Sequence, residues 1–212
     1  MATRRRSLRT QAERTTAMRA RVLDATVECL VERGYTGTTT TAVVKRAGVS
    51  RGAVLHHFPT KQNLVTSAVE YVLEQRNAAF VRRFASSLPP RRDEHFVDAM
   101  VQALWTEVNG PMFFAWLELI VASRTHPELR ASVAAIAERW TETTDQGFRQ
   151  IFVLPRTPGR HPHALAPLFT FMVLYGLALE KIARPNATDI EKRVLRALKT
   201  MAPLATMAKL TD

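Results

Sequence analysis

Residues 34–61 read GYTGTTTTAVVKRAGVSRGAVLHHFPTK, and this stretch decides the expected fold of the chain. Threonines are poor inside a helix but good at its start, because a hydroxyl accepts from the free amides of the first turn. They predict a short helix from about Thr39 to Ala47. Gly48 permits a tight turn, and Ser50 can cap a further helix, which Pro59 ends. The stretch therefore predicts a helix-turn-helix.

An apolar seam is expected to hold this motif together. The seam consists of Val43, Val49, Val54 and Phe58. Since residues on the other side of a helix face away from such a seam, an outer face remains. That face carries Arg51, Gly52, Leu55 and His56.

A longer helix is predicted before the motif, from about Thr16 to Gly34. Apolar and small side chains recur in it at helical spacing, namely Val22, Thr26, Cys29 and Leu30. Residues 1–14 are rich in arginine and lack such periodicity, so they predict a flexible basic arm. The arm either adds phosphate or minor-groove contacts or stays solvated.

Charge gathers at the start of the chain. The formal net charge is +11, and the first 62 of the 212 residues carry twelve Lys and Arg against four acids. The other 150 residues carry 18 basic against 15 acidic side chains. A basic head on a nearly balanced body indicates a polyanionic partner for the head, and double-stranded DNA fits a helix-turn-helix.

With these features, residues 18–75 resemble the DNA-binding domain of the TetR family of transcriptional regulators. The matching positions are Gly34, Tyr35, Thr38, Thr39, Ala47, Gly48, Val49, Ser50, Gly52, His57, Phe58 and Lys61. The resemblance implies an all-α homodimer of about nine helices per chain. Its domains would be a flexible basic arm (1–14), the helix-turn-helix domain (15–60) and a ligand-binding and dimerisation domain (61–212).

The resemblance also implies roles for single residues. Thr40 and Thr41 would face the groove, whereas His57 and Lys61 would contact phosphates. The full expected DNA-binding set is Thr39, Thr40, Thr41, Ser50, Arg51, Gly52, Ala53, Leu55, His56, His57 and Lys61. Arg51 can read a guanine edge with two hydrogen bonds. Leu55 departs from the aromatic residue common in the family and is expected to pack on a thymine methyl.

Two residues near this surface have open alternatives. Arg46 either contacts DNA or braces Glu28 or Glu32 within the head. The adjacent His56 and His57 point about 100° apart on a helix, which argues against a shared metal ion.

Prolines and glycines divide the rest of the chain into further expected helices. They run from Thr60 to about Ser86, Asp93 to about Val108, Met112 to Ser123, Glu128 to about Val153, His163 to Ala183 and Thr188 to Leu210. Aromatic and apolar side chains gather in the middle of this body. A largely apolar pocket for a small-molecule effector would be lined by Trp105, Met112, Phe113, Trp116, Trp140 and Phe148, unless these side chains form the core. Glu118 would pair with a cationic ligand, or else stay exposed or bridge to Arg124 or Arg83.

The last two helices carry more apolar surface than one core needs. This surface predicts a four-helix interface between two subunits. Its expected residues are Phe171, Tyr175, Leu179, Val194, Leu198 and Met201.

Several functional classes are not expected. The lone Cys29 fits a reducing cytoplasm and a buried, structural role. The longest uncharged run, Ala164 to Leu179, is short for a membrane span. We find no phosphate loop, metal-ligand spacing or nucleophile elbow, so neither a cofactor, a metal nor an enzymatic activity is expected.

The sequence thus predicts a cytoplasmic DNA-binding transcriptional regulator. The favoured interpretation is a repressor released from a pseudo-palindromic operator by a small molecule. An activator or an architectural DNA-binding protein without ligand control would have the same head. A basic helical protein that binds membrane surfaces or partner proteins is a more distant alternative.

Overall fold

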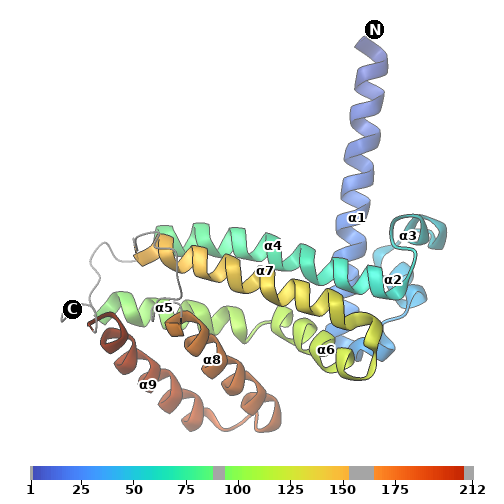
Figure 1. Ribbon diagram of the computed structural model, residues 1–212. Helices are drawn as coiled ribbons and strands as arrows, with labels where there is room; N and C mark the ends of the chain where they lie inside the picture. Colours follow the sequence, from blue (N-terminus) through green and yellow to red (C-terminus); the bar gives the residue numbers. More distant parts are fainter. Residues whose placement is uncertain (1, 88–93, 153–164, 208–212) are drawn as a thin grey trace. The chain divides into compact units, whose positions relative to one another are not determined.

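The computed structural model describes residues 2–87, 94–152 and 165–207, and throughout these ranges the regular structure is helical. Packing divides the chain into two compact units (Figure 1). The first unit comprises Met1–Arg76 and Pro111–Ile136, and the second comprises Asn77–Gly110 and Ala137–Asp212. The all-α expectation is confirmed. The predicted boundary at residue 60 divides a DNA-binding domain from a ligand-binding domain. It does not coincide with the two packing units, and it stays a prediction.

The first unit is built around α1 (Ala2–Gly37), which packs against α2 (Thr40–Ala47) and α6 (Pro111–Thr125). It also contains α3 (Arg51–His57) and the beginnings of α4 (Lys61–Ser87) and α7 (Pro127–Phe152). Its core consists of fully buried apolar side chains contributed by all six helices. They include Val22, Leu30, Val43, Val54, Leu64, Leu119 and Leu129.

The second unit contains α5 (Glu94–Val108), α8 (Leu165–Ala183) and α9 (Thr188–Met207), together with the ends of α4 and α7. Each of α5 and α8 packs against α9, and α5 also contacts α8. The buried side chains at these contacts include Val101, Trp105, Leu174, Ala178, Leu195 and Leu198.

The clearest difference from the expected elements is the start of α1. The helix begins at Ala2 and not near Thr16, the start that the sequence predicted. Whether residues 1–14 behave as a flexible basic arm stays a prediction. This segment contains five Arg, two Ala and one Gln, which are good helix formers. Extending a formed helix also adds one hydrogen bond for each residue ordered. A segment therefore needs no apolar face to continue a helix that is anchored further along.

The remaining helices follow the expected pattern with ends shifted by a few residues. Asp93, Val153, His163 and Leu210, which were expected at helix ends, lie outside the described residues. Within the described part of the chain, no helix is both long and apolar enough to cross a bilayer.

Candidate DNA-binding interface

Local hydrogen bonds set the geometry of α2, the turn and α3. The Ala42 amide donates to Thr39 Oγ1 at 3.1 Å, so Thr39 is the N-cap of α2. Gly48 adopts a left-handed conformation (φ 63°, ψ 42°), and its amide donates to the Val44 carbonyl at 3.1 Å. The Ala53 amide donates to Ser50 Oγ at 3.2 Å, which caps α3. The caps expected from sequence are therefore present.

The expected seam holds α3 against the rest of the first unit. Val43 and Val54 are fully buried and Phe58 is 3% exposed, whereas Val49 is half-buried. The opposite face of α3 is open to solvent, as expected. Its exposed residues are Arg51, Gly52, Leu55 and His56, and Ala53 and His57 are half-buried.

Leu55 is an apolar side chain that the fold leaves 39% exposed. The neighbouring rings of His56 and His57 meet edge to face, with centroids 4.9 Å apart. Arg51, at the start of the helix, makes no hydrogen bond or ion pair with any described residue. An exposed arginine, an exposed apolar side chain and an imidazole thus share one face of α3. Base edges offer groups that match them, since guanine accepts hydrogen bonds and thymine carries a methyl group.

The structure resolves the two alternatives for Arg46. Its guanidinium contacts both Glu28, at 3.1 Å, and Glu32, so it braces α2 against α1. The hydrogen bond from Arg46 lowers the pKa of Glu32. Arg46 is therefore part of the support of the motif.

Lys61 has contacts that its expected role does not require. Its Nζ donates to the Thr36 carbonyl at 3.3 Å and lies 4.1 Å from the centre of the Tyr35 ring. Partial burial lowers the pKa of this amine. In this arrangement Lys61 holds α4 to the end of α1, and a phosphate would have to compete with these contacts.

The end of α1 contains a backbone conformation that requires glycine. Gly34 has φ 66° and ψ −179°, which interrupts the helix as predicted, and a final turn follows from Tyr35 to Gly37. Non-glycine residues essentially never adopt this combination of angles. A Cβ placed on Gly34 would lie 2.8 Å from Glu118 Oε2.

Glu118 on α6 occupies this kink, and the sequence did not indicate that. The Tyr35 amide donates to Glu118 Oε2 at 3.0 Å, and His126 lies beside the Tyr35 ring with centroids 5.0 Å apart. The predictions for Glu118 (a cationic ligand, exposure or an arginine bridge) missed this partner. No local signal links residues that are 83 positions apart, because the pairing depends on how α1 and α6 cross.

The six predicted pocket residues are distributed over both units. Met112, Phe113 and Trp116 belong to the first unit and are 4–5% exposed. Trp105 and Trp140 belong to the second, and the side chain of Phe148 lies outside the described part. Trp140 packs edge to face on Phe171 and Tyr175, at 6.0 Å from each ring. The pocket stays a prediction.

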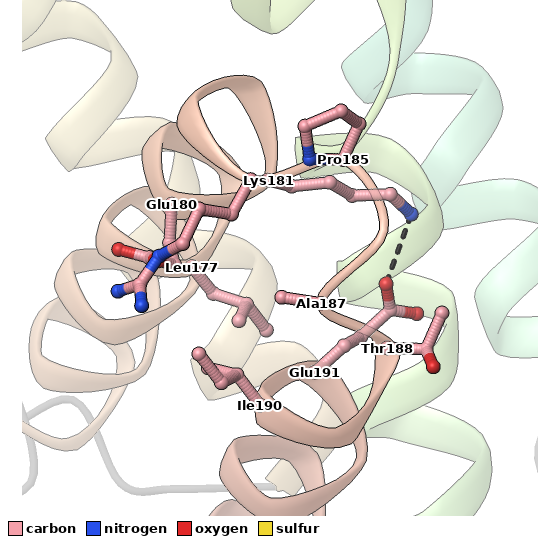
Figure 2. A pocket seen from close by; sticks show the side chains of 9 residues that line it. Leu177, Glu180, Lys181, Pro185, Ala187, Thr188, Ile190 and Glu191 are labelled. Atoms are coloured by element: carbon pink, nitrogen blue, oxygen red, sulfur yellow. Dashed lines mark hydrogen bonds and ion pairs between the residues drawn. The ribbon is translucent and has the colours of Figure 1, made fainter.

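A small hollow in the second unit lies at the turn between α8 and α9 (Figure 2). Lys181 Nζ donates to Glu191 Oε2 at 2.9 Å, and Trp105 Nε1 donates to the other carboxylate oxygen at 3.1 Å. The bond from Lys181 contributes most to the lowered pKa of Glu191. The cavity volume is about 10 Å³, far below the ~300–1,000 Å³ usual for ligand pockets. The buried Trp105 therefore has a hydrogen-bond partner for its indole N–H within the second unit, as expected of a structural core side chain.

The predicted dimer residues fall into two groups. Phe171 and Tyr175 are half-buried and pack on each other and on Trp140, while Leu198 is 5% exposed and Val194 is half-buried. Leu179 and Met201 are exposed. Further exposed apolar side chains on α8 are Leu168, Phe169, Met172 and Ile182.

These features define an all-helical protein with a helix-turn-helix head. Residues 22–68 match the family model described as bacterial regulatory proteins, tetR family, and residues 91–204 match that of the tetracycline repressor-like C-terminal domain. The chain belongs to the TetR family of bacterial transcriptional regulators.

Individual relatives agree with this assignment. The chain is 34% identical to the HTH-type transcriptional regulator CymR of Pseudomonas putida over 131 residues, 62% of this chain and 63% of CymR. It thus spans less than two thirds of the curated relatives it first matches. A TetR-family protein of Mesorhizobium loti has the same fold, with a TM-score of 0.70 at 17% identity over 92% of this chain and 98% of that one. FadR of Bacillus subtilis, solved with stearoyl-CoA, has a TM-score of 0.58 at 17% identity over 84% and 96%.

Proposed function

We propose that this chain is a cytoplasmic, DNA-binding transcriptional repressor that acts as a homodimer and is released from its operator by a small molecule. The exposed face of α3 supports this proposal most strongly, because the caps at Ser50 and Gly48 hold it in a defined orientation. In a two-fold dimer, two such helices would enter successive major grooves of a pseudo-palindrome, about 34–36 Å apart. Regulation by binding alone, without a catalytic step, is part of the proposal.

The roles within the face follow from its chemistry. Arg51 would donate two hydrogen bonds to a guanine, and Leu55 would pack on a thymine methyl. Thr40 and Thr41 on α2, with His57 and Lys61, would contact the sugar-phosphate backbone and set the register of α3. Lys61 would exchange its hydrogen bond to the Thr36 carbonyl for a phosphate.

The exposed apolar face of α8 supports the homodimer. Phe169, Met172 and Leu179 are 46–55% exposed, and the exposed Gly176 lies on the same side of the helix. Contiguous apolar side chains on one helix face are typical of a protein interface, and a glycine among them permits a close approach. Met201 on α9 would extend the interface.

The effector is proposed to be largely apolar. FadR shows that this fold can hold a small molecule with a long alkyl chain, although the likeness in fold does not transfer that ligand to this chain. Trp105, Phe113 and Trp116 are only 4–5% exposed, so an effector that contacts them would have to displace the helices around them.

The kink at Gly34 offers a route from the body to the head. Because Glu118 accepts from the Tyr35 amide, a displacement of α6 would act directly on the end of α1. Arg46 joins α2 to α1, and α2 packs on α3, so the same displacement would reorient the recognition face. A coupling of about 1–3 kcal/mol would reduce operator affinity by about 5- to 150-fold.

Selection of duplexes from a random pool, followed by titration of the selected and the random duplex, tests the DNA-binding role. Arg51→Ala should weaken the selected duplex by about 5- to 150-fold and the random duplex much less. Arg124→Ala, which removes an exposed arginine on α6, is the matched control and should change neither affinity by more than a small factor. Equal weakening of both duplexes by Arg51→Ala would contradict the assignment of a base contact to Arg51.

Release by an effector needs a separate measurement. Compounds that raise the unfolding temperature of the protein should include at least one that dissociates the selected duplex. If stabilising compounds leave the complex intact, an activator or an architectural protein without ligand control is the better description.

A further inference from the structure

The N-terminal part of α1 is a strongly basic helix. Residues 2–21 contain seven arginines and one acid, Glu13. Arg4, Arg5, Arg6 and Arg9 belong to the helical segment 2–14, and the side chains of Arg14, Arg19 and Arg21 are exposed. No other part of the chain concentrates positive charge to this degree.

The charge is not balanced within the segment. Like charges at spacings of three and four residues repel each other in a helix. Arg5 and Arg9 have this spacing, as do Arg6 and Arg9. A partner with regularly spaced negative charges would relieve this repulsion and stabilise the helix.

The C-terminal end of this basic stretch, at Arg19, lies beside the recognition helix α3. The guanidinium carbon of Arg19 lies 5.6 Å from the centre of the Phe58 ring, and Phe58 is the C-cap of α3. From there α1 runs on beyond α2 and α3 (Figure 1). At 1.5 Å per residue, the thirteen residues 2–14 extend about 18–20 Å, which equals the rise of about five or six base pairs along the axis of a DNA duplex.

We infer that residues 2–14 of α1 form a second DNA contact, a basic helix that binds the phosphates flanking the half-site recognised by α3. The inference rests on the proposed DNA-binding function and adds a partner surface outside the helix-turn-helix. The contact is electrostatic and independent of sequence, so it increases affinity for every duplex and does not improve discrimination. It requires positive charge and helical continuity, not a particular hydrogen-bond pattern.

The salt dependence of DNA affinity tests this contact in the full-length protein. The probes are a duplex selected by the wild-type protein and a random duplex of the same length. Replacing Arg4, Arg5, Arg6 and Arg9 together by Gln should reduce the slope of log affinity against log salt by about 2–4 per protomer. The loss of affinity should be the same for both duplexes. An unchanged slope would overturn the inference.

A matched variant carries Lys at the same four positions. Because Lys keeps the charge, it should retain the wild-type slope, and a slope like that of the Gln variant would overturn the phosphate contact. If the wild-type protein itself selects no duplex, the proposed function fails, whereas a selected duplex with unchanged slopes defeats only this inference.

Vesicles rich in anionic phospholipid provide the competing partner. Loss of vesicle binding in the Gln variant without loss of DNA slope would assign the segment to a membrane surface instead.

Discussion

Gly34 and Gly48 both have positive φ, but they differ in their surroundings. At Gly48 a Cβ would meet no atom within 4 Å, so Gly48→Ala should lower the free energy of unfolding by about 1 kcal/mol through backbone strain alone. At Gly34 the backbone is more restrictive and Glu118 Oε2 lies in the path of a Cβ. Gly34→Ala should therefore cost about 3 kcal/mol, as measured by urea unfolding.

The Glu118→Ala background separates the two causes at Gly34. Once the carboxylate is absent, only the backbone strain remains, and the extra cost of Gly34→Ala should fall by about 1 kcal/mol or more. The cost of Gly48→Ala should not change in the same background. If Gly34→Ala lowers the free energy of unfolding equally in the wild-type and Glu118→Ala backgrounds, Glu118 does not oppose the new methyl group.

The pair of Arg46 and Glu32 predicts a pH-dependent stability. Because Arg46 lowers the pKa of Glu32 in the folded protein, this contribution is present above the pKa of an unfolded glutamate. It is lost as the pH falls through the folded value. Arg46→Ala should lower the unfolding temperature near neutral pH, and the difference from wild type should shrink at about pH 3. Since both side chains are partly exposed, the effect should be small and should decrease with salt.

At the scale of elements, the exposed face of α8 leads to a prediction about assembly. Met172→Glu places a charge in the centre of the proposed interface and should shift a dimer to monomers in analytical ultracentrifugation at micromolar concentration. Val121→Glu on α6 is the matched control, because Val121 is 53% exposed and Met172 is 55% exposed. The control should leave the assembly unchanged, and a dimeric Met172→Glu variant would exclude this face.

Elements differ in how far they could be predicted. The limits of α2 and α3 were predictable because Thr39, Gly48 and Ser50 act through hydrogen bonds within four residues. The start of α1 was not, since the segment before Thr16 has no apolar periodicity and its helix continues one that is anchored further along. On α8, periodicity predicted an apolar stripe but not which side packs inside the unit. Phe171 and Tyr175 contact Trp140, whereas Met172 faces solvent.

At the scale of the whole molecule, the route through Glu118 makes a prediction about release. Glu118→Ala removes the hydrogen bond between α6 and the Tyr35 amide, so a bound effector should have less influence on the head. The ratio of operator affinities without and with effector should fall towards one in this variant. Arg51→Ala should instead lower both affinities and keep their ratio. An undiminished ratio in Glu118→Ala would assign the coupling to other contacts.

The sequence by itself determined the helix-turn-helix, its exposed residues and the family, because caps, turns and apolar spacing act over a few residues. Only the tertiary structure decided that Glu118 closes the kink at Gly34, that Arg46 braces α1 and that Lys61 contacts Tyr35 and Thr36. Each of these contacts joins side chains to groups 14–83 positions away in the chain. Such partners depend on how helices cross, and the crossing results from the packing of the whole unit and not from any local pattern.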